Sequence, residues 1–188
     1  MGIKVTKTEI DGVLIIEPDY FFDERGYYAE TFSERSLIGS GIKVEKHFVQ
    51  DSHSYNVRAR TFRGFHFQNK PHNQTKIVRC VRGKMIDIAI DLRKNSKTYL
   101  KAVCVELSAE NHKQLYIPNY CAHGYLTLED NVEMVYKLDE FWYPTSESSI
   151  NIDDITLPIK LPFPKDTLIY NKKDKMAPHI KDAKIDVE

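Results

Sequence analysis

The sequence predicts an all-β fold, either a sandwich or a jelly roll, with a few short helices. Apolar residues alternate with a period of two along KMIDIAIDL at 84–92, as in a strand that turns one face to the core. Similar short runs, rich in β-branched and aromatic residues, recur between Gly, Pro, Asn, Asp and Ser. Many short strands at regular spacing are typical of these two architectures. With 188 residues, the chain is expected to form a single domain over 1–188.

The individual elements follow from the same patterns. The turn VRG predicts a hairpin that joins a strand at 76–81 to the strand at 84–92. The segment 33–41 predicts a short helix, with Ser33 as its N-cap and glycines at its end. From about Leu157 the chain is rich in proline and charge, which predicts a segment that wraps over the barrel surface. The remaining strands are expected at 12–18, 26–32, 47–55, 61–68, 99–108, 114–118, 123–129 and 132–141.

The charge balance argues against nucleic acid as a partner. Lys plus Arg and Asp plus Glu both number 27, so no basic excess is present to neutralise a phosphate backbone. No apolar run approaches the roughly 20 residues that a membrane span needs, and MGIKVTKTEI has no apolar signal core. We therefore expect a soluble cytoplasmic protein that does not bind membranes.

The segment RGFHFQ carries polar residues inside a predicted strand. Strict alternation places His66 and Gln68 on one face with Gly64, and Arg63 on the other. Glycine inside a strand often marks a bulge, and a bulge here would turn Arg63 toward the same cavity as His66. A lone histidine is more often a hydrogen-bonded core residue than a functional one. Lys76 is either a solvated lysine at the end of a strand or a cation brought near the imidazole by a neighbouring strand.

A second histidine follows a proline and a turn of small residues, in IPNYCAHGY, where it is His123. This block and GFHFQ together resemble the two motifs of the cupin barrels. A metal-binding cupin needs a His-x-His pair and a nearby carboxylate in its first motif. Here Gln68 takes the place of the second histidine, and no Glu follows in the loop NKPHNQTK. The sequence therefore predicts no metal site.

Tyr136 shares the apolar face of VEMVYKLDEF with Val132, Met134 and Leu138, so its ring is expected to point inward. The hydroxyl is either that of a core tyrosine bonded to backbone or an acid that faces a cavity. Asp174, in YNKKDKMAP, is by composition one of several charged residues near the end of the chain.

Six blocks, in order and at similar spacing, resemble the dTDP-4-dehydrorhamnose 3,5-epimerases, which are cofactor-free cupins of nucleotide-sugar and polysaccharide metabolism. The blocks are FDERGYYAETF, FVQDSHS, FRGFHFQNKPHNQTKIVRCVRGKMIDIAIDLRKNS, LSAENHKQLYIPNYCAHGY, YKLDEFWYPTSE and NKKDKMAP. The resemblance implies a cupin jelly roll that forms a homodimer, with the N-terminal strand added to the partner's sheet. It also implies a nucleoside-diphosphate 4-keto-6-deoxy sugar as substrate, usually dTDP-linked, and no metal or other cofactor.

The resemblance also implies a role for each matching residue. His66 is expected to be the general base, oriented by Asp174, and Tyr136 the acid on the opposite face of the sugar. Lys76 is expected to stabilise the enolate oxygen. Substrate contacts are implied for Arg25, Glu30, Gln50, Arg63, His123, Glu147 and Lys173.

The reaction explains why these residue types are needed. The hydrogens at C3 and C5 are each α to the C4 ketone, so removal of either leaves an enolate with its negative charge on O4. A preorganised cation lowers that barrier, and a base that titrates near neutral pH suits the proton transfer. Arginine provides the two-pronged donor geometry that a diphosphate favours.

Three features depart from the family pattern. Ser52 stands where an asparagine is usual, Trp142 stands where a tyrosine is usual, and SINIDDITLPIKLPFP has no tryptophan. Ser52 and Trp142 fall at presumed ligand-binding positions. An enzyme that inverts only C3 or only C5, or a ketoisomerase acting on a related 4-keto nucleotide sugar, therefore stays open. So does a cupin that binds sugar nucleotides without catalysis.

Overall fold

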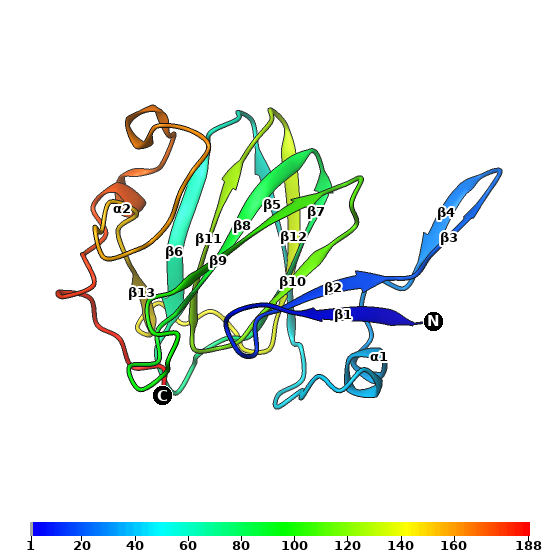
Figure 1. Cartoon of the computed structure of the whole chain (residues 1–188), viewed down its shortest axis with the longest axis horizontal. Helices are drawn as coiled ribbons and strands as arrows, with labels where there is room; N and C mark the ends of the chain where they lie inside the picture. Colours follow the sequence, from blue (N-terminus) through cyan, green and yellow to red (C-terminus); the bar gives the residue numbers. More distant parts are fainter. Residues whose placement is uncertain (1) are drawn as a thin grey trace.

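Two antiparallel β-sheets face each other in the computed structural model, which describes residues 2–188 (Figure 1). The six-stranded sheet has the order β1 (Ile3–Lys7), β2 (Leu14–Pro18), β10 (Gln114–Ile117), β7 (Lys76–Arg82), β12 (Val132–Leu138), β5 (Gln50–Asn56). The five-stranded sheet has the order β13 (Glu147–Ser149), β6 (Phe62–Gln68), β11 (Cys121–Thr127), β8 (Lys84–Asp91), β9 (Ala102–Ser108). This arrangement confirms the predicted all-β class.

Short helices account for little of the described chain. The first, α1 (Glu34–Gly39), begins where predicted, because the Ser33 hydroxyl accepts a hydrogen bond from the backbone N–H of Ser36. The others are the 3₁₀-helix η1 (Lys165–Thr167) and α2 (Lys172–Lys175). None of the helices in residues 2–188 has the length and apolar character to cross a membrane.

The predicted hairpin between 76–81 and 84–92 is wrong. Gly83, with φ of +72°, does reverse the chain, but β7 and β8 belong to different sheets. β7 pairs with β10 and β12, whereas β8 pairs with β9 and β11. The tight turn therefore carries the chain from one sheet to the other. The sequence pattern also missed β1, β3 and β13, which are short and mostly exposed or half-buried.

Both faces of the five-stranded sheet are buried, which the alternation along β8 could not indicate. Met85 and Ala89 pack inward against the six-stranded sheet, while Ile88 and Ile90 pack outward. The outward cluster is covered by the segment after β13, including Ile150, Ile152, Leu157, Leu168 and Val187. In Figure 1 this segment, orange to red, lies beside β6 and β13.

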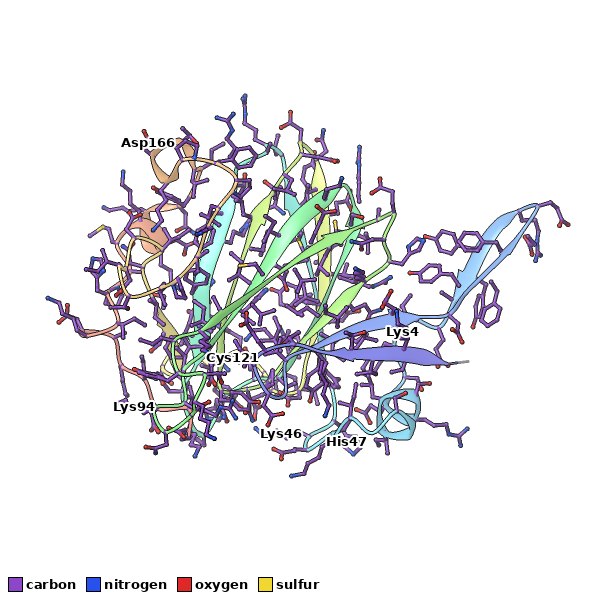
Figure 2. All side chains as sticks on the ribbon, in the orientation of Figure 1. Lys4, Lys46, His47, Lys94, Cys121 and Asp166 are labelled. Carbon is purple, nitrogen blue, oxygen red and sulfur yellow. The ribbon has the colours of Figure 1, made fainter. Side chains whose placement is uncertain are left out.

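A two-stranded hairpin, β3 (Tyr20–Asp23) and β4 (Gly26–Ala29), projects away from the barrel (Figure 1). We call it the arm. Figure 2 shows side chains of both sheets pointing into the space between them. At the base of the arm, the ring of Tyr20 stacks on that of His112, with centroids 3.8 Å apart. The exposed aromatic residues of the arm are Phe21, Phe22, Tyr27 and Tyr28.

The strand β6 contains the bulge expected at Gly64. His66 pairs with His123 and Arg63 pairs with Tyr125, so β6 has one more residue than β11 between these two pairs. Gly64 has a φ of +138°, and a Cβ at this position would lie 2.6 Å from the Cα of Gly124. Glycine is needed here for both its conformation and its size.

We expect Gly64→Ala to lower the free energy of unfolding by about 2–4 kcal/mol, since alanine disfavours this φ and meets the backbone of β11. Urea unfolding followed by circular dichroism measures the effect. Gly39→Ala is the matched control, because a Cβ on this helical residue meets no atom within 4 Å. An unchanged midpoint for Gly64→Ala would contradict the requirement for glycine.

Candidate active site

A cavity of about 560 Å³ opens between the two sheets, lined by residues of β5, β6, β7, β11 and β12. The sequence had indicated thirteen site residues. The cavity brings together eight of them, namely Gln50, Arg63, His66, Lys76, His123, Tyr136, Trp142 and Glu147.

His66 and Asp174 form a hydrogen-bonded pair at one wall of this cavity. The Nε2 atom of His66 lies 2.7 Å from Oδ1 of Asp174, whose carboxylate is almost fully buried. The other carboxylate oxygen accepts a bond of 3.3 Å from the backbone N–H of Gly64. The Nδ1 atom of His66 has no hydrogen-bond partner within residues 2–188, and the side chain is one-third exposed. The pair therefore leaves one imidazole nitrogen available to a ligand.

The bulge at Gly64 orients two side chains toward the cavity. Phe62 and Phe65 both pack in the outward cluster, with ring centroids 5.2 Å apart, while Arg63 and His66 both line the cavity. The Nε of Arg63 donates a 3.0 Å bond to the amide oxygen of Asn56, which is buried. This bond holds the guanidinium by one nitrogen.

Tyr136 reaches the cavity from the opposite sheet. It lies on β12, between Ser52 of β5 and Val78 of β7, whereas His66 lies on β6. A ligand between the two sheets would therefore have the imidazole on one side and the phenol on the other. Met134 and Leu138 line the same cavity, so the inward face predicted for β12 is confirmed.

Lys76 is a buried cation in the floor of the cavity. Its residue is 7% exposed, and its ammonium group makes no hydrogen bond or ion pair with the rest of the chain in residues 2–188. Burial lowers the pKa of Lys76 to about 8, opposed by the nearby acidic groups of Asp139, Cys121 and Asp87. The lysine comes from β7 and the imidazole from β6, which are not neighbouring strands as expected but strands of facing sheets.

A second histidine–carboxylate pair lies deeper in the barrel. Nε2 of His123 is 2.7 Å from Oδ1 of Asp87, and both residues are buried. The other oxygen of Asp87 has no hydrogen-bond partner among the described residues. Sequence reasoning missed Asp87, although a carboxylate between the inward-facing Met85 and Ala89 was a usable signal.

The other predicted site residues lie at the rim of the cavity or behind it. Lys173 pairs with Glu147 at 2.7 Å, and Ser52 accepts a 3.0 Å bond from the amide of Gln50. Of the residues that line the cavity, Trp142 is highly exposed, with 56% of the residue accessible.

Two predicted contacts lie outside the cavity of this chain. Arg25 is at the tip of the arm, paired with Asp23, and it is highly exposed. Glu30 follows the arm and accepts a 2.7 Å bond from the hydroxyl of Ser36.

No group of three His, Cys, Asp or Glu side chains within residues 2–188 is arranged to hold a metal ion. The position that a metal cupin would give to its second histidine is that of Gln68, whose amide bonds to backbone atoms of two loops.

The chain is similar over nearly its whole length to one family of known proteins. A family model described as dTDP-4-dehydrorhamnose 3,5-epimerase matches residues 7–182. The enzyme of that name from Methanothermobacter thermautotrophicus is 45% identical over 171 residues, which are 90% of this chain and 90% of that one.

Solved structures of the same family share the fold. The dTDP-4-dehydrorhamnose 3,5-epimerase of Elizabethkingia anophelis has a TM-score of 0.90 and 39% identity, covering 97% of this chain and 98% of that one. A Legionella pneumophila epimerase in complex with dTDP-4-keto-L-rhamnose has a TM-score of 0.88 and 34% identity, covering 95% and 93%. The cupin jelly roll expected from the sequence is thereby confirmed.

The buried lysine predicts a stability that depends on pH. The pKa of Lys76 is about 8 in the folded protein instead of its ordinary 10.5. At a pH where the lysine is charged in both the folded and the unfolded chain, this difference lowers the free energy of unfolding by about 3 kcal/mol. We therefore expect Lys76→Met to be about 2–3 kcal/mol more stable than the unsubstituted protein at pH 7. Between pH 8 and 10.5 the unfolded chain binds more protons than the folded one, so the stability of the unsubstituted protein rises with pH. Above this range the two proteins should have the same free energy of unfolding.

Urea unfolding of both proteins at pH 7, 9 and 10.5 measures this difference. Lys4→Met is the control, because Lys4 is an exposed lysine whose ion pair with Glu17 contributes little. A Lys76→Met protein no more stable than the unsubstituted one at pH 7 would show that the ammonium is well solvated.

Proposed function

The chain belongs to the dTDP-4-dehydrorhamnose 3,5-epimerase family, and we propose that its cavity inverts C3 and C5 of a dTDP-linked 4-keto-6-deoxy sugar. The protein is an isomerase, as predicted. The observation that carries the proposal is the placement of His66, paired with Asp174, on one sheet and Tyr136 on the other, on either side of one cavity.

The first step is removal of a proton from a carbon beside the C4 ketone. Nδ1 of His66 takes the proton while Nε2, as an N–H, donates to Asp174 and fixes the tautomer. The imidazolium that forms is stabilised by this carboxylate. The electrons of the C–H bond move into an enolate with its charge on O4, where the ammonium of the buried Lys76 stabilises it.

The second step returns a proton to the opposite face of the same carbon. Tyr136 reaches the cavity from the facing sheet, so its phenol can deliver a proton where the imidazole cannot. Inversion follows from the placement of base and acid on two different sheets. The C4 ketone re-forms as the proton arrives, and no redox step is required. The imidazolium of His66 then loses its proton to solvent and the phenolate of Tyr136 takes one up, which restores both groups.

The remaining polar residues supply binding. Arg63 keeps its terminal guanidinium nitrogens for the diphosphate, since Nε is bonded to Asn56. His123 lines the same cavity with Nε2 bonded to Asp87, and it is assigned as a further substrate contact. The rest of the nucleotide is assigned to Gln50, Ser52, Trp142, Glu147 and Lys173.

The protein is also proposed to act as a homodimer. The arm exposes four aromatic residues, which is unusual for a monomeric surface and typical of a contact between chains. Arg25, at its tip, is a predicted diphosphate contact that lies away from the cavity of its own chain. An arm from a second copy would place Arg25 at that cavity and bury these rings. The outer edge of β1 is also free to pair with another strand.

The reaction predicts exchange with solvent. In D₂O with dTDP-4-keto-6-deoxyglucose, we expect NMR to show deuterium at C3 and C5 of the sugar. We expect His66→Asn to lower the exchange rate by about 10²- to 10⁴-fold, because the base is lost. His47→Asn is the matched control, as His47 also pairs with a carboxylate, that of Glu34, but is exposed and outside the cavity.

Several outcomes would change the assignment. Deuterium at one carbon alone would indicate an enzyme that inverts a single centre, and a product without the C4 ketone would indicate a ketoisomerase. Tight binding of dTDP without any deuterium exchange into the sugar would indicate a protein that binds sugar nucleotides without catalysis.

The dimer predicts activity across subunits. Light scattering should give twice the chain mass of 21.9 kDa, and Phe22→Glu with Tyr28→Glu should give monomers. Arg25→Ala and His66→Asn should each be impaired alone. Mixed after dissociation, they should regain about a quarter of the unsubstituted activity, because each mixed dimer holds one intact site. A mixture no more active than the separate variants would contradict the contribution of Arg25 from the partner.

A further inference from the structure

The loop that carries Trp142 is held by two glutamine side chains from another part of the chain. The amide nitrogen of Gln68 donates to the carbonyl of Phe141 at 3.1 Å, and its amide oxygen accepts from the backbone N–H of Tyr143 at 2.6 Å. The amide nitrogen of Gln74 donates to the carbonyl of Glu140 at 2.8 Å. The backbone on both sides of Trp142 is therefore bonded to these side chains.

We propose that Gln68 and Gln74 form an amide latch that fixes the 140–143 loop, so that the indole of Trp142 stands as a wall of the substrate cavity. Trp142 and both glutamines line that cavity. The part of this inference that concerns substrate binding rests on the proposed function. Gln68 and Gln74 are positioning residues in this scheme, because they act through the loop.

The burial of these amides argues that the latch is specific. Gln68 is 2% exposed and Gln74 is 6% exposed, so polar atoms on either side chain must find partners in the protein. An amide offers both a donor and an acceptor, which the Phe141 carbonyl and the Tyr143 N–H require together. Glutamate at position 68, when ionised, would have no proton to donate to the carbonyl.

A third contact holds the same loop from its side. The rings of His72 and Tyr143 are stacked, with centroids 3.5 Å apart, and Gln68 also donates to the carbonyl of His72. The 69–75 loop and the 140–143 loop are thus joined through one side chain. The indole of Trp142 lies exposed beside the cavity, while the residues before and after it are held by hydrogen bonds.

The latch links groups of the proposed reaction that are far apart in sequence. Gln68 is two residues after His66, and Gln74 is two residues before Lys76. The loop that they hold follows β12, which carries Tyr136. The segment 66–76 therefore fixes His66, Lys76 and the 140–143 loop relative to one another. Loss of the latch should free the cavity wall without removing the reacting groups.

Trp142 is the one tryptophan of the chain, so its fluorescence reports on this loop directly. In Gln68→Met and Gln74→Met, we expect time-resolved anisotropy to show a larger fast motion of the indole. Titration of the Trp142 emission with dTDP should give a Kd about tenfold higher than in the unsubstituted protein, and KM should rise by a similar factor while kcat changes less than about threefold. Retained circular dichroism would show that the barrel is intact.

Gln114→Met provides the matched control. Gln114 is equally buried and its amide donates to the carbonyl of Thr31 at 2.8 Å, away from the cavity, so the anisotropy of Trp142 should stay unchanged. If Gln68→Met does not fold, Gln74→Met, which loses a single bond, decides the question.

Unchanged indole motion in the folded latch variants would overturn the latch. Greater motion with unchanged dTDP affinity and KM would overturn its role in substrate binding. If the unsubstituted protein binds dTDP but exchanges no deuterium, the proposed reaction fails, while the anisotropy and dTDP titration still decide the latch.

Discussion

The bulge at Gly64 is the constraint on which the site depends. A regular strand would turn Arg63 and His66 to opposite faces, but the extra residue turns both into the cavity and both flanking phenylalanines outward. It also leaves the Gly64 N–H free of the β-ladder to bond Asp174, the partner of His66. The position of the imidazole, the position of its carboxylate and the position of the guanidinium thus follow from one local irregularity. The close approach of Gly124 allows no side chain at that point.

The segment that covers the outer face of the five-stranded sheet does more than bury apolar surface. It carries Asp174 to His66 from 108 residues away, and α2 is held there by an Asn171 cap on the Asp174 N–H at 2.7 Å. The amide of Asn151 then donates to the carbonyls of Lys175 and Ala177, both at 3.1 Å. Packing of this segment therefore fixes the orientation of His66.

Sequence patterns predicted the positions of the strands better than they predicted which strands pair in the sheets. The alternation along 84–92 identified β8, but it could not show that both faces are buried, and the turn at Gly83 led to a hairpin where the chain changes sheets. His66 was found from its local context and Arg63 only through the assumption of a bulge. Asp174 had no local signal, because its role depends on a contact across the fold; the family resemblance alone identified it. The position of Arg25 outside the cavity of its own chain was not predicted either, because periodicity does not indicate where the arm lies relative to the barrel.

In the proposed reaction, the placement of His66 and Tyr136 on facing sheets accounts for inversion but not for the choice of carbon. C3 and C5 both flank C4, so a single enolate oxygen near Lys76 serves either deprotonation. Rotation of the sugar about that fixed oxygen would bring one carbon or the other to His66. The chemistry is then common to both centres, and selectivity is set by whatever limits that rotation. Trp142, a wall residue that departs from the family pattern, and the glutamines that hold its loop are the groups in this chain placed to set that limit.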